Sequence, residues 1–469
     1  MAASICQGCV ALTQLVEQLR AEITQLRAEL AAVKSELAAA KKNSTTSSKP
    51  PSSDIVKPPR SKSNKKRNRG GQRGHKRHER PPFDAGQIGD TVEYTLSGCP
   101  DCGGRLKLSD EPPRVVQQVE LVAKPVEIVE HQALAYWCAK CRKTHYAAID
   151  NAVRKAGLIG PGLTTLIAYL KGACHCSFST IRKFVRDVLG LKVSRGYLAK
   201  LIAKVSDSLQ FAYDSLLALL PQQKVVNTDE TGHKTNGQAL WTWCFRAPLF
   251  TLFKISPSRG ADVLLEVLGR EFDGLLGCDY FSAYRKYMRQ CNVLVQFCLA
   301  HLIRDLKFLT THPHGRTRAY GERVLGAVRA LFALIHRQGR MKPAAFQVAL
   351  ENAGDELWAS AVWQVPNTKE ARNLARRFEK HGHSYIRFIS SPDIDPTNNM
   401  AEQAIRFVVL DRHVTQGTRG EVGQHWSERI WTVIATCTQQ TRDLFPFLRE
   451  SVSALFQGKP SPTLQPNTS

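Results

Sequence analysis

The chain has 469 residues, too many for one hydrophobic core, and 43% of them are apolar, so length and composition predict about three packed domains. Its formal net charge of +24 at pH 7 favours a polyanionic partner, because basic groups that neutralise phosphates release condensed counterions. A membrane protein is excluded, because no apolar run approaches the roughly 18 to 20 residues that span a bilayer and the charged N-terminal segment lacks a signal-peptide pattern.

Residues 10–40 have the heptad pattern of a coiled coil. Two apolar sets recur every seven residues: Leu12, Leu19, Leu26 and Val33, and Val16, Ile23, Leu30 and Leu37. We assign the second set to heptad position a and the first set to position d. In a parallel two-stranded coiled coil, Glu22 at position g then faces Arg27 at position e of the partner helix, and Glu29 faces Lys34 in the same way. We expect a parallel homodimer. A surface helix packed on its own chain is the alternative, although such a helix usually has a wider apolar stripe.

Residues 41–82 have the composition of an extended basic arm. A linker rich in Ser, Thr and Pro, which cannot bury a core, begins the segment. Between Lys41 and Arg80 there are fourteen Lys or Arg and two acidic residues, a net charge of +12. Arginine and glycine without apolar periodicity suit phosphate contacts or a minor-groove arm, whereas a solvated charge run is the alternative. We expect these basic residues to contact DNA: Lys65, Lys66, Arg67, Arg69, Arg73, Lys76 and Arg77.

Two CxxC pairs within residues 83–150 predict a zinc-ribbon domain. The pairs are Cys99 with Cys102 and Cys138 with Cys141. Thirteen cysteines in a chain without a signal-peptide pattern indicate thiols and metal sites rather than disulfides. Four thiolates at about 2.3 Å form a closed tetrahedral site for one structural Zn²⁺ ion. The alternating, β-branched segment between the pairs, residues 115–131, favours hairpin strands. The 35 residues between the pairs exceed the spacing of compact fingers, and free thiols are the alternative.

Residues 151–221 favour helices with a helix-turn-helix pattern. Two short amphipathic segments flank Gly190, and Ser194 is a suitable N-cap for the second. The basic residues Arg195 and Lys200 suit contact with DNA, and plain helix packing is the alternative. Residues 174–176, Cys-His-Cys, resemble a ligand cluster. Because adjacent residues on a helix diverge, we expect a buried or incidental role for them.

From residue 222 to residue 310 the pattern changes to short strands and helices. Strand-like segments at 224–232, 239–247 and 249–256 are followed by a helix, a strand, a helix and a strand. That order is the order of the RNase H-like core, a mixed sheet with helices on its faces.

Three carboxylates fall where that fold brings its elements together. Asp229 lies near the end of the first strand and Asp279 at the end of the fourth, and these strands are neighbours in the sheet. Glu230 points to the opposite face from Asp229, so only one of them enters a shared site, and we choose Asp229. Glu402 lies in the first turns of a helix that packs across the sheet. Arg406, one turn later, is placed to orient Glu402 or to contact a phosphate.

Converging carboxylates of this kind hold divalent cations. Two cations about 4 Å apart activate the attacking oxygen and stabilise the leaving oxygen of an in-line phosphodiester displacement. Hard carboxylate oxygens with open positions suit Mg²⁺, so we expect two catalytic Mg²⁺ ions. Uncompensated, the carboxylates repel one another and raise their pKa values, so metal binding and DNA binding are expected to be coupled.

Eight motifs occur in order along the chain: NSTTSSKPPSSD, GGQRGHK, CPDCGGRL, CAKC, DETG, CDYFSAY, CLAHLIRDL and TNNMAEQAIR. Together they resemble the transposases of the insertion sequence 66 family over nearly the whole chain. In that family three of these motifs carry the acids of a DDE triad, which implies that role for Asp229, Asp279 and Glu402. The resemblance also implies a helical insertion at residues 311–395. Gln403 stands where the family commonly has Arg, a departure that leaves the metal ligands intact.

The resemblance extends to residues around the site. Cys298 and His301 match a CxxH pattern that follows the second acid in related transposases. We expect His301 to contact DNA or brace the site, and a helix-cap histidine beneath the sheet is the alternative. Trp358 and Trp363 of the insertion are candidates for stacking on flipped bases, although burial in a core is the role we expect for them.

The fold class predicted is multidomain α/β: an RNase H-like mixed-sheet catalytic core with a helical insertion, preceded by coiled coil, zinc ribbon and helical DNA-binding region. Residues 396–457 would complete the core, and residues 458–469 are expected to be disordered. The predicted function is that of a DNA transposase, which frees a 3′-OH at an element end and joins it to target DNA. Its expected partners are double-stranded DNA, a second copy through the coiled coil and element-encoded accessory proteins, in the bacterial cytosol at the nucleoid. A DNA-binding regulator or co-opted derivative without turnover, and an RNase H-like nuclease, are the alternatives.

Overall fold

The computed structural model describes residues 7–40, 81–97, 99–107, 110, 112–119, 125–391 and 393–466. The chain divides into two units, residues 59–130 and the remainder. The arm residues predicted to contact DNA, Lys65 to Arg77, lie outside the described residues. Among the described residues, no helix has the length and apolar character needed to cross a membrane.

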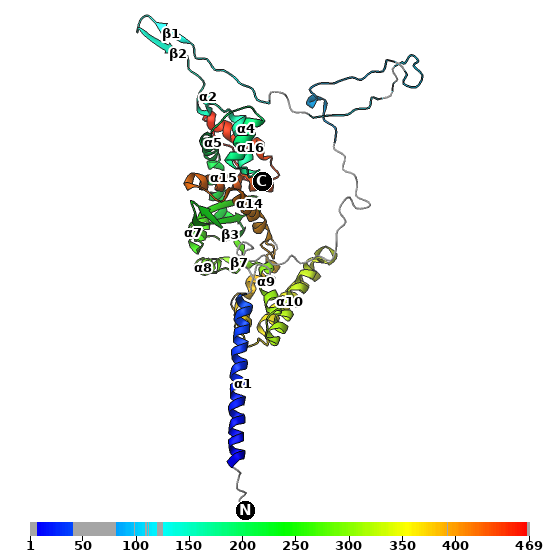
Figure 1. Ribbon diagram of the computed structural model, residues 1–469, viewed down its shortest axis with the longest axis vertical. Coiled ribbons are helices and arrows are strands. Elements are labelled where there is room, and N and C mark those ends of the chain that lie inside the picture. Colours follow the sequence, from blue (N-terminus) through cyan, green and yellow to red (C-terminus); the bar gives the residue numbers. More distant parts are fainter. Residues whose placement is uncertain are drawn as a thin grey trace, which may run out of the picture. The chain divides into compact units, whose positions relative to one another are not determined.

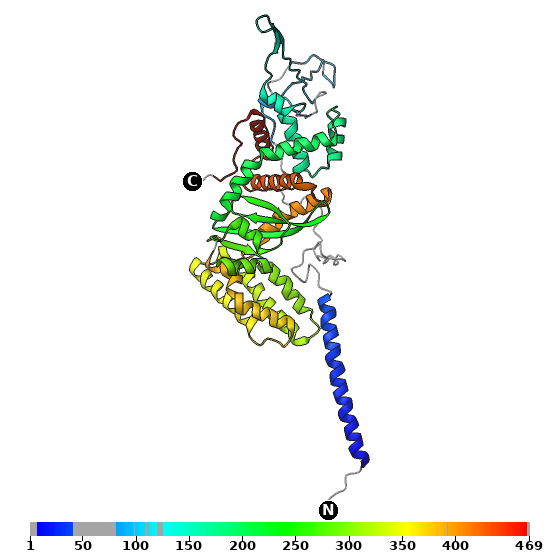
Figure 2. The ribbon, with the colours of Figure 1, turned by 90° about the vertical axis from the view of Figure 1, so that its left-hand side faces the viewer.

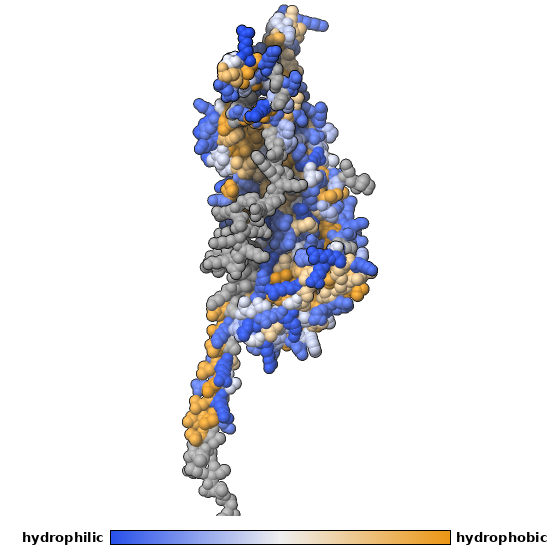
Figure 3. Space-filling model, turned by 90° about the vertical axis from the view of Figure 1, so that its right-hand side faces the viewer, coloured by the Kyte–Doolittle hydropathy of each residue, from blue (hydrophilic) through white to orange (hydrophobic). Residues whose placement is uncertain are grey.

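α1 is a single helix of 34 residues from Gln7 to Ala40, about 51 Å long at 1.5 Å per residue. Its Ala, Leu, Glu and Arg content gives high helix propensity along the whole length. The residues of both heptad sets are 40% to 64% exposed. Figure 3 shows hydrophobic side chains along one side of α1 and hydrophilic ones along the other. The helix therefore presents a narrow, exposed apolar stripe.

The hairpin around the second cysteine pair consists of β1 (Ala135–Cys138) and β2 (Lys143–Tyr146), paired antiparallel. The strands predicted for residues 115–131 were wrong as far as the structure describes that segment: residues 112–119 and 125–131 contain no strand. The physical reason is exposure, since Val116 is 92% and Ile128 84% exposed. A sheet without a buried face lacks the packing that stabilises strand pairing.

The helical region before the sheet matches the predicted pattern. Ser194 caps the second of the two amphipathic helices, accepting a hydrogen bond from the Tyr197 backbone N–H, and Gly190 in the connection has a positive φ of 70°. Arg195 and Lys200 are exposed. The helices of this region are α2 (Asn151–Ala156), α3 (Pro161–Gly172), α4 (Phe178–Asp187), α5 (Arg195–Ser208), α6 (Gln210–Leu219) and the short η3 (Leu220–Gln222).

A five-stranded mixed sheet follows, and its elements come in the predicted order. They are β3 (Val225–Thr235), β4 (Gln238–Arg246), β5 (Thr251–Ser256), α7 (Ala261–Leu268), β6 (Leu275–Cys278), α8 (Ser282–Cys291) and β7 (Leu294–Phe297). The spatial order is β5-β4-β3-β6-β7. β3, β4 and β5 pair antiparallel, whereas β6 and β7 run parallel to β3. Asn236 and Gly237, both with positive φ, form the tight turn between β3 and β4.

The edge strand β5 is covered by a helix rather than left open. α15 (Gly420–Gln439) packs along β5, as α14 (Asn399–Thr415) packs on β3 and β4 (Figure 1). Three α15 side chains, four residues apart, accept hydrogen bonds from alternate backbone N–H groups of β5. Glu428 accepts from Ile255, Thr432 from Phe253 and Thr436 from Thr251. The unpaired donors of the sheet edge are thereby satisfied within the fold.

Helices fill the predicted insertion at residues 311–395, and they begin earlier than predicted, because residues 299–310, assigned to the core from the sequence, also form a helix. Its elements are α9 (Leu299–Thr310), α10 (Gly315–Ile335), η4 (Gln338–Arg340), α11 (Pro343–Val362), α12 (Lys369–His381), η5 (Gly382–Tyr385) and α13 (Arg387–Ser390). α10 packs against α9 and α11, and η5 packs against β7. Figure 2 shows these yellow helices grouped at one end of the sheet.

The C-terminal helix α16 (Leu444–Gln457) packs on α2, α3 and α5. The prediction of a disordered tail after Gln457 was wrong for residues 458–466, which the structure describes. Leu464 is fully buried. Gln440 and Arg442 donate hydrogen bonds to the backbone carbonyls of Leu464 and Thr463. One buried leucine and two paired carbonyls fix a segment whose Pro-rich composition alone suggests disorder.

Candidate active site

The regular pairing of β3 directs Asp229 and Glu230 to opposite faces of the sheet. Glu230 accepts hydrogen bonds from Arg259 at 2.8 Å and 3.0 Å and from the Tyr284 hydroxyl. Arg259 in turn lies over the rings of Trp241 and Phe281, at 4.3 Å and 4.1 Å. The Glu230 carboxylate is thus buried in a cationic and aromatic setting of its own. The Asp229 side chain lies on the other face of the sheet.

Asp279 follows β6 directly, at the edge where β6 runs beside β3. Its carboxylate accepts a hydrogen bond of 2.8 Å from the Phe281 backbone N–H, which fixes the turn into α8. β3 and β6 are paired in parallel as far as Asn227 and Gly277. Two residues beyond this pair are Asp279, just after β6, and Asp229, which lies in the middle of β3 rather than near its end as predicted, because β3 continues to Thr235.

The third carboxylate arrives on α14, whose start is anchored to β3 through Asn398. The side chain of Asn398 donates to the Thr228 carbonyl at 2.8 Å and accepts from the Asn227 amide at 3.0 Å. The backbone N–H of Asn398 donates to Cys298 Sγ at 3.1 Å. Asn398 therefore does not cap its own helix with its side chain. It connects the helix to the strand that carries Asp229.

Glu402, one turn into α14, is held by two residues of α9. Arg304 donates to Glu402 Oε1 at 2.9 Å and to His301 Nε2 at 3.0 Å. Because His301 Nε2 accepts, its proton is on Nδ1, which lies 3.4 Å from the same Glu402 oxygen without forming a hydrogen bond to it, so His301 braces Glu402 chiefly by positioning Arg304. Burial and Arg304 lower the pKa of His301 to about 3, so the ring is neutral. Of the two roles predicted for His301, bracing the site fits this geometry.

Burial is the main cause of the raised pKa values among the carboxylates, and repulsion between acidic side chains adds to it. Burial, together with the charges of Glu230, Asp279 and Glu402, raises the pKa of Asp229 well above its usual range. Burial and Glu230 raise the pKa of Asp279 to about 7. Oxygen donors that repel one another in a partly buried site are stabilised by divalent cations, so these residues fit a hard metal ion.

A second set of donors lies next to the carboxylates. In the part of the chain that the structure describes, Cys298, His301 and Glu402 bring their ligand atoms within 4.8 Å of one another. Burial raises the pKa of Cys298 to about 11, and its sulfur already accepts from the Asn398 backbone. A protonated, hydrogen-bonded thiol is a poor metal ligand. This set therefore fits a bracing role better than a soft-metal site.

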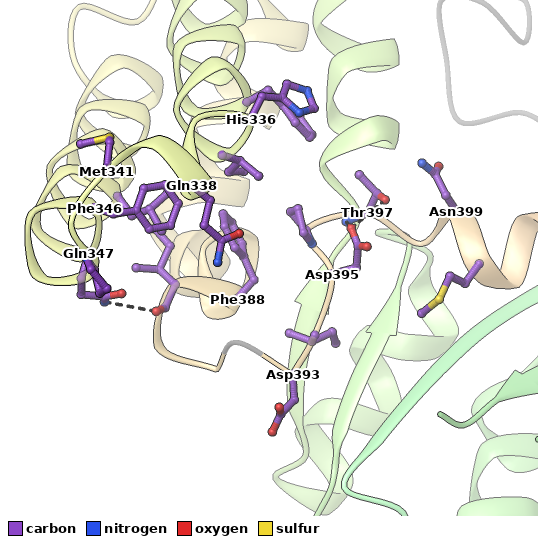
Figure 4. Close-up of a pocket in the computed structure, with 18 of the residues that line it drawn as sticks. His336, Gln338, Met341, Phe346, Gln347, Phe388, Asp393, Asp395, Thr397 and Asn399 are labelled. Carbon is purple, nitrogen blue, oxygen red and sulfur yellow. Dashed lines mark hydrogen bonds between the residues drawn. The ribbon is translucent and has the colours of Figure 1, made fainter. Parts of the chain in front are cut away.

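A cavity of about 940 Å³ lies between the insertion and the segment that leads into α14. Figure 4 shows Met341, Phe346 and Gln347 on one side of it and Asp395 and Thr397 on the other. The Asp395 carboxylate accepts from the Thr397 backbone N–H and hydroxyl, which makes this a local turn. α14 is held by its packing on β3 and β4, by the Asn398 contacts and by the bond from Arg304 to Glu402.

The structure brings the ligand atoms of Cys298, His301 and Glu402 within 4.8 Å of one another. Asp229, Asp279 and Glu402 do not form so close a group among the described residues, although the charges of Asp279 and Glu402 reach Asp229 and raise its pKa. Arg406 is exposed, and the partners of Glu402 are Arg304 and His301 instead. Residues that the sequence analysis missed are Asn227, Asn398, Arg304, Arg259 and Tyr284. The paired asparagines of the TNNM motif and the spacing of His301 and Arg304, three residues apart on a helix, were the available signals.

Each cysteine pair forms a tight turn of similar design. The residue after the second cysteine has a positive φ in both, 71° at Gly103 and 51° at Arg142. Hydrogen bonds from the turn lower the pKa of Cys99, and those from Cys141 and Lys140 lower the pKa of Cys138. Both turns therefore favour thiolates, the form that binds zinc.

Two other groups differ from their predictions. Residues 174–176 lie in the connection between α3 and α4 rather than on a helix, and His175 bonds to Asp411 at 3.2 Å and contacts the Phe407 ring. Its role is to tie α14 to the helical region. Trp358 and Trp363, expected in a core, are 43% and 69% exposed, because each lies on the outer side of the insertion helices.

Comparison with known proteins identifies the family. Residues 156–425, more than half of the chain, match the family described as Transposase IS66 family. The chain belongs to this family of transposases. Residues 9–81 match a second family, described as a family of unknown function (DUF6444). An uncharacterized protein, y4qI, from Sinorhizobium fredii is 25% identical over 353 residues, which cover 68% of this chain and 64% of that relative.

Proposed function

We propose that the protein is a DDE transposase that cuts DNA at the ends of an insertion sequence and joins the freed 3′ ends to target DNA. The observation that supports the proposal is the placement of Asp229 on β3, Asp279 directly after β6 and Glu402 on α14. Burial, with the charges of Glu230, Asp279 and Glu402, raises the pKa of Asp229, as expected for acids near one another. Membership of the IS66 transposase family supports the same activity.

The strand order supports an RNase H-like core. Three antiparallel strands followed by two strands parallel to the first, with helices between them, give the order β5-β4-β3-β6-β7. In this sheet the end of β6 lies beside the middle of β3, where Asp229 lies, which favours a site shared between the two strands. The anchored start of α14 would add the third acid from across the sheet.

In the proposed mechanism, Asp229, Asp279 and Glu402 would hold two Mg²⁺ ions. When bound, these ions would activate the attacking oxygen and stabilise the leaving oxygen. Arg304 and His301 orient Glu402, and Asn398 fixes the distance between α14 and β3. In the first step water attacks the scissile phosphorus and the bond to the 3′ oxygen breaks. In the second, that 3′-OH attacks a target phosphorus and a target hydroxyl leaves.

The cysteine pairs are proposed to bind one structural Zn²⁺ ion. The support is chemical: both CxxC turns have the same backbone design, and in each the first thiol has a lowered pKa. Four thiolates would fill a tetrahedral site and leave no open position, so the role is structural rather than catalytic. The domain proposed for this function comprises residues 83–150.

Three segments are proposed to bind DNA or a second subunit. The basic arm of residues 41–82 and the exposed Arg195 and Lys200 of α5 would contact element ends, and Arg406 a phosphate near the site. The exposed stripe of α1 would form a parallel coiled coil that holds two subunits, and thus two ends, together. Accessory proteins of the element remain proposed partners, and the site of action would be the nucleoid in the bacterial cytosol.

A strand-transfer assay tests the proposal. A labelled duplex of the element end, a supercoiled target and Mg²⁺ are incubated with wild type, with Asp279→Asn and with the control Asp273→Asn, an exposed Asp beside β6. Joined products from wild type and the control, but not from Asp279→Asn, are expected. Degradation without joining would identify a nuclease, and binding without any cleavage would identify a regulator.

A further inference from the structure

A stripe of positive charge lies on the exposed side of α12 in the insertion. Its four basic residues recur every three or four positions: Lys369, Arg372, Arg376 and Lys380. At 3.6 residues per turn they fall within an arc of about 80° and extend over about 16 Å. All four are exposed, whereas Ala371, Leu374 and Phe378 on the opposite side are buried. The stripe serves no packing role in the insertion.

Tyr280, the residue after Asp279, connects this stripe to α8 and to the carboxylate site. Its ring lies 4.4 Å from the guanidinium of Arg285 on α8 and 4.3 Å from that of Arg377 on α12. His381, at the end of α12, contacts the same ring. Burial lowers the pKa of His381, and Arg285, Arg289 and Lys380 lower it further. The charges of α8 and α12 therefore surround one point beside Asp279.

These charges lack acidic partners. In the described part of the chain, no ion pair joins an acidic side chain to Arg285, Arg289, Arg376 or Lys380. The Nε of Arg285 is buried and has no hydrogen-bond acceptor. Arg377 differs, since it is paired with Asp305 at 2.8 Å. A cluster of like charges without counter-charges is stabilised by a polyanion.

We propose that the basic surface formed by the half-buried Arg285 and the exposed Arg289 of α8, with the exposed Arg372, Arg376 and Lys380 of α12, binds the phosphate backbone of the DNA held beside Asp279. The inference rests on the proposed function, because it names where the insertion grips the DNA of that site. It assigns the insertion a positioning role that none of the predicted DNA-binding segments covers.

The dimensions and chemistry favour a DNA backbone. A strand of duplex DNA carries one phosphate per 3.4 Å of axis, so the stripe of about 16 Å spans about five of them. Arginine offers planar, paired donors that match phosphate oxygens. Basic side chains spaced along a helix surface contact phosphates irrespective of base sequence, so this surface fixes register and orientation rather than specificity.

The test measures DNA affinity as a function of salt with the full chain. The variant Arg372→Ala/Arg376→Ala/Lys380→Ala removes three charges from the stripe. The matched control, Arg329→Ala/Arg337→Ala/Arg340→Ala, removes three exposed charges from α10 and its C-terminal turn. The single variant Arg289→Ala tests α8. Fluorescence anisotropy of a labelled element-end duplex, and of a scrambled duplex of equal length, gives the slope of log affinity against log salt.

The stripe variant is expected to lower the steepness of that slope by about 2 to 3, because each lost phosphate contact contributes about 0.9. Its affinity for both duplexes should fall at least tenfold at about 150 mM salt, and Arg289→Ala should reduce the slope by about 1. Equal slopes for the stripe variant and the control would overturn the inference. If the stripe variant lowers the salt dependence of binding but the wild-type protein never cleaves DNA, the basic surface would be supported and the proposed transposase activity contradicted. Absence of DNA binding by wild type would contradict both.

Discussion

The side-chain amide of Asn227 donates a hydrogen bond of 3.0 Å to the side-chain carbonyl oxygen of Asn398, 171 residues further along the chain. Asn398 also donates to the Thr228 carbonyl, and both asparagines are almost fully buried. This connection aligns the start of α14 with the strand that carries Asp229. The separation of Asp229 from Glu402 thus depends on two neutral residues that carry none of the proposed chemistry.

Replacing Asn398 with Ala should reduce cleavage more than it reduces stability. The change leaves the Thr228 carbonyl and the Asn227 amide buried without partners, which costs about 1 to 3 kcal/mol in the free energy of unfolding. A domain of ordinary stability stays folded after such a loss, whereas the cleavage rate is expected to fall at least tenfold, because Glu402 shifts with α14. Urea unfolding and single-turnover cleavage measure the two. Asn399→Ala, at the exposed next position, is the control, and equal cleavage rates for the two variants would refute the anchoring role.

Gly277 should tolerate no side chain, because it makes room for Asn227. A Cβ at Gly277 would lie 2.3 Å from the Asn227 side-chain nitrogen. Gly277→Ala is therefore expected to displace Asn227, to cost about 1 to 3 kcal/mol and to slow cleavage as Asn398→Ala does. Gly232→Ala on β3, where a Cβ meets nothing within 4 Å, is the matched control. Indistinguishable cleavage by the two variants would mean that the Asn227 position is not critical.

Asp229→Asn should stabilise the metal-free protein and abolish its response to metal. Removing one of several repelling carboxylates relieves the strain that raises the pKa of Asp229. For wild type, adding Mg²⁺ at about a hundred times its Kd should stabilise the fold by about 2.7 kcal/mol, an effect that excess EDTA reverses. Thermal melting with and without Mg²⁺ measures both effects, with Asp273→Asn as the control. A Tm increase with Mg²⁺ that persists in Asp229→Asn would exclude this residue as a ligand.

Glu428 should make the fold less stable as pH rises. Burial raises its pKa from 4.5 to about 7, so between these values the folded state keeps a proton that the unfolded state has released. Stability therefore falls through this window, and the loss, up to about 3 kcal/mol, is complete above about pH 7. Glu428→Gln keeps the acceptor for the Ile255 N–H and should be more stable than wild type at pH 8 but not at pH 4.5. Urea unfolding at both pH values compares it with Glu421→Gln, an exposed change on the same helix. A pH-independent difference would contradict the raised pKa.

The placement of the acids could be predicted because it follows from local patterns. Strand alternation separates Asp229 from Glu230, and the order of strands and helices makes β3 and β6 neighbours. Both depend on residues close in sequence, whose hydrophobic periodicity is visible without the fold. The helical insertion was predicted from the family resemblance, and the amphipathic pattern of its segments supported that prediction.

What could not be predicted depends on contacts between distant segments. The bond between Asn227 and Asn398 and the contact of Arg304 with Glu402 join residues that no local pattern relates. Leu464 is fully buried and its carbonyl accepts a hydrogen bond from Gln440, 24 residues earlier, while its Pro-rich neighbours suggested disorder. Trp358 and Trp363 show the converse, since their size suggested a core but the insertion leaves them on its surface.

The measurement that tests the central claim most directly is Mg²⁺-dependent cleavage of a labelled element end by Glu402→Gln, beside the control Gln403→Ala. Glu402→Gln keeps the shape of the side chain and an oxygen that can accept from Arg304, and loses the charge that would hold metal. The account predicts that Glu402→Gln binds the DNA as tightly as wild type and loses cleavage and joining at least a thousandfold, while Gln403→Ala remains within about tenfold of wild type. Cleavage by Glu402→Gln at the wild-type rate would contradict the account and require another residue as the third ligand.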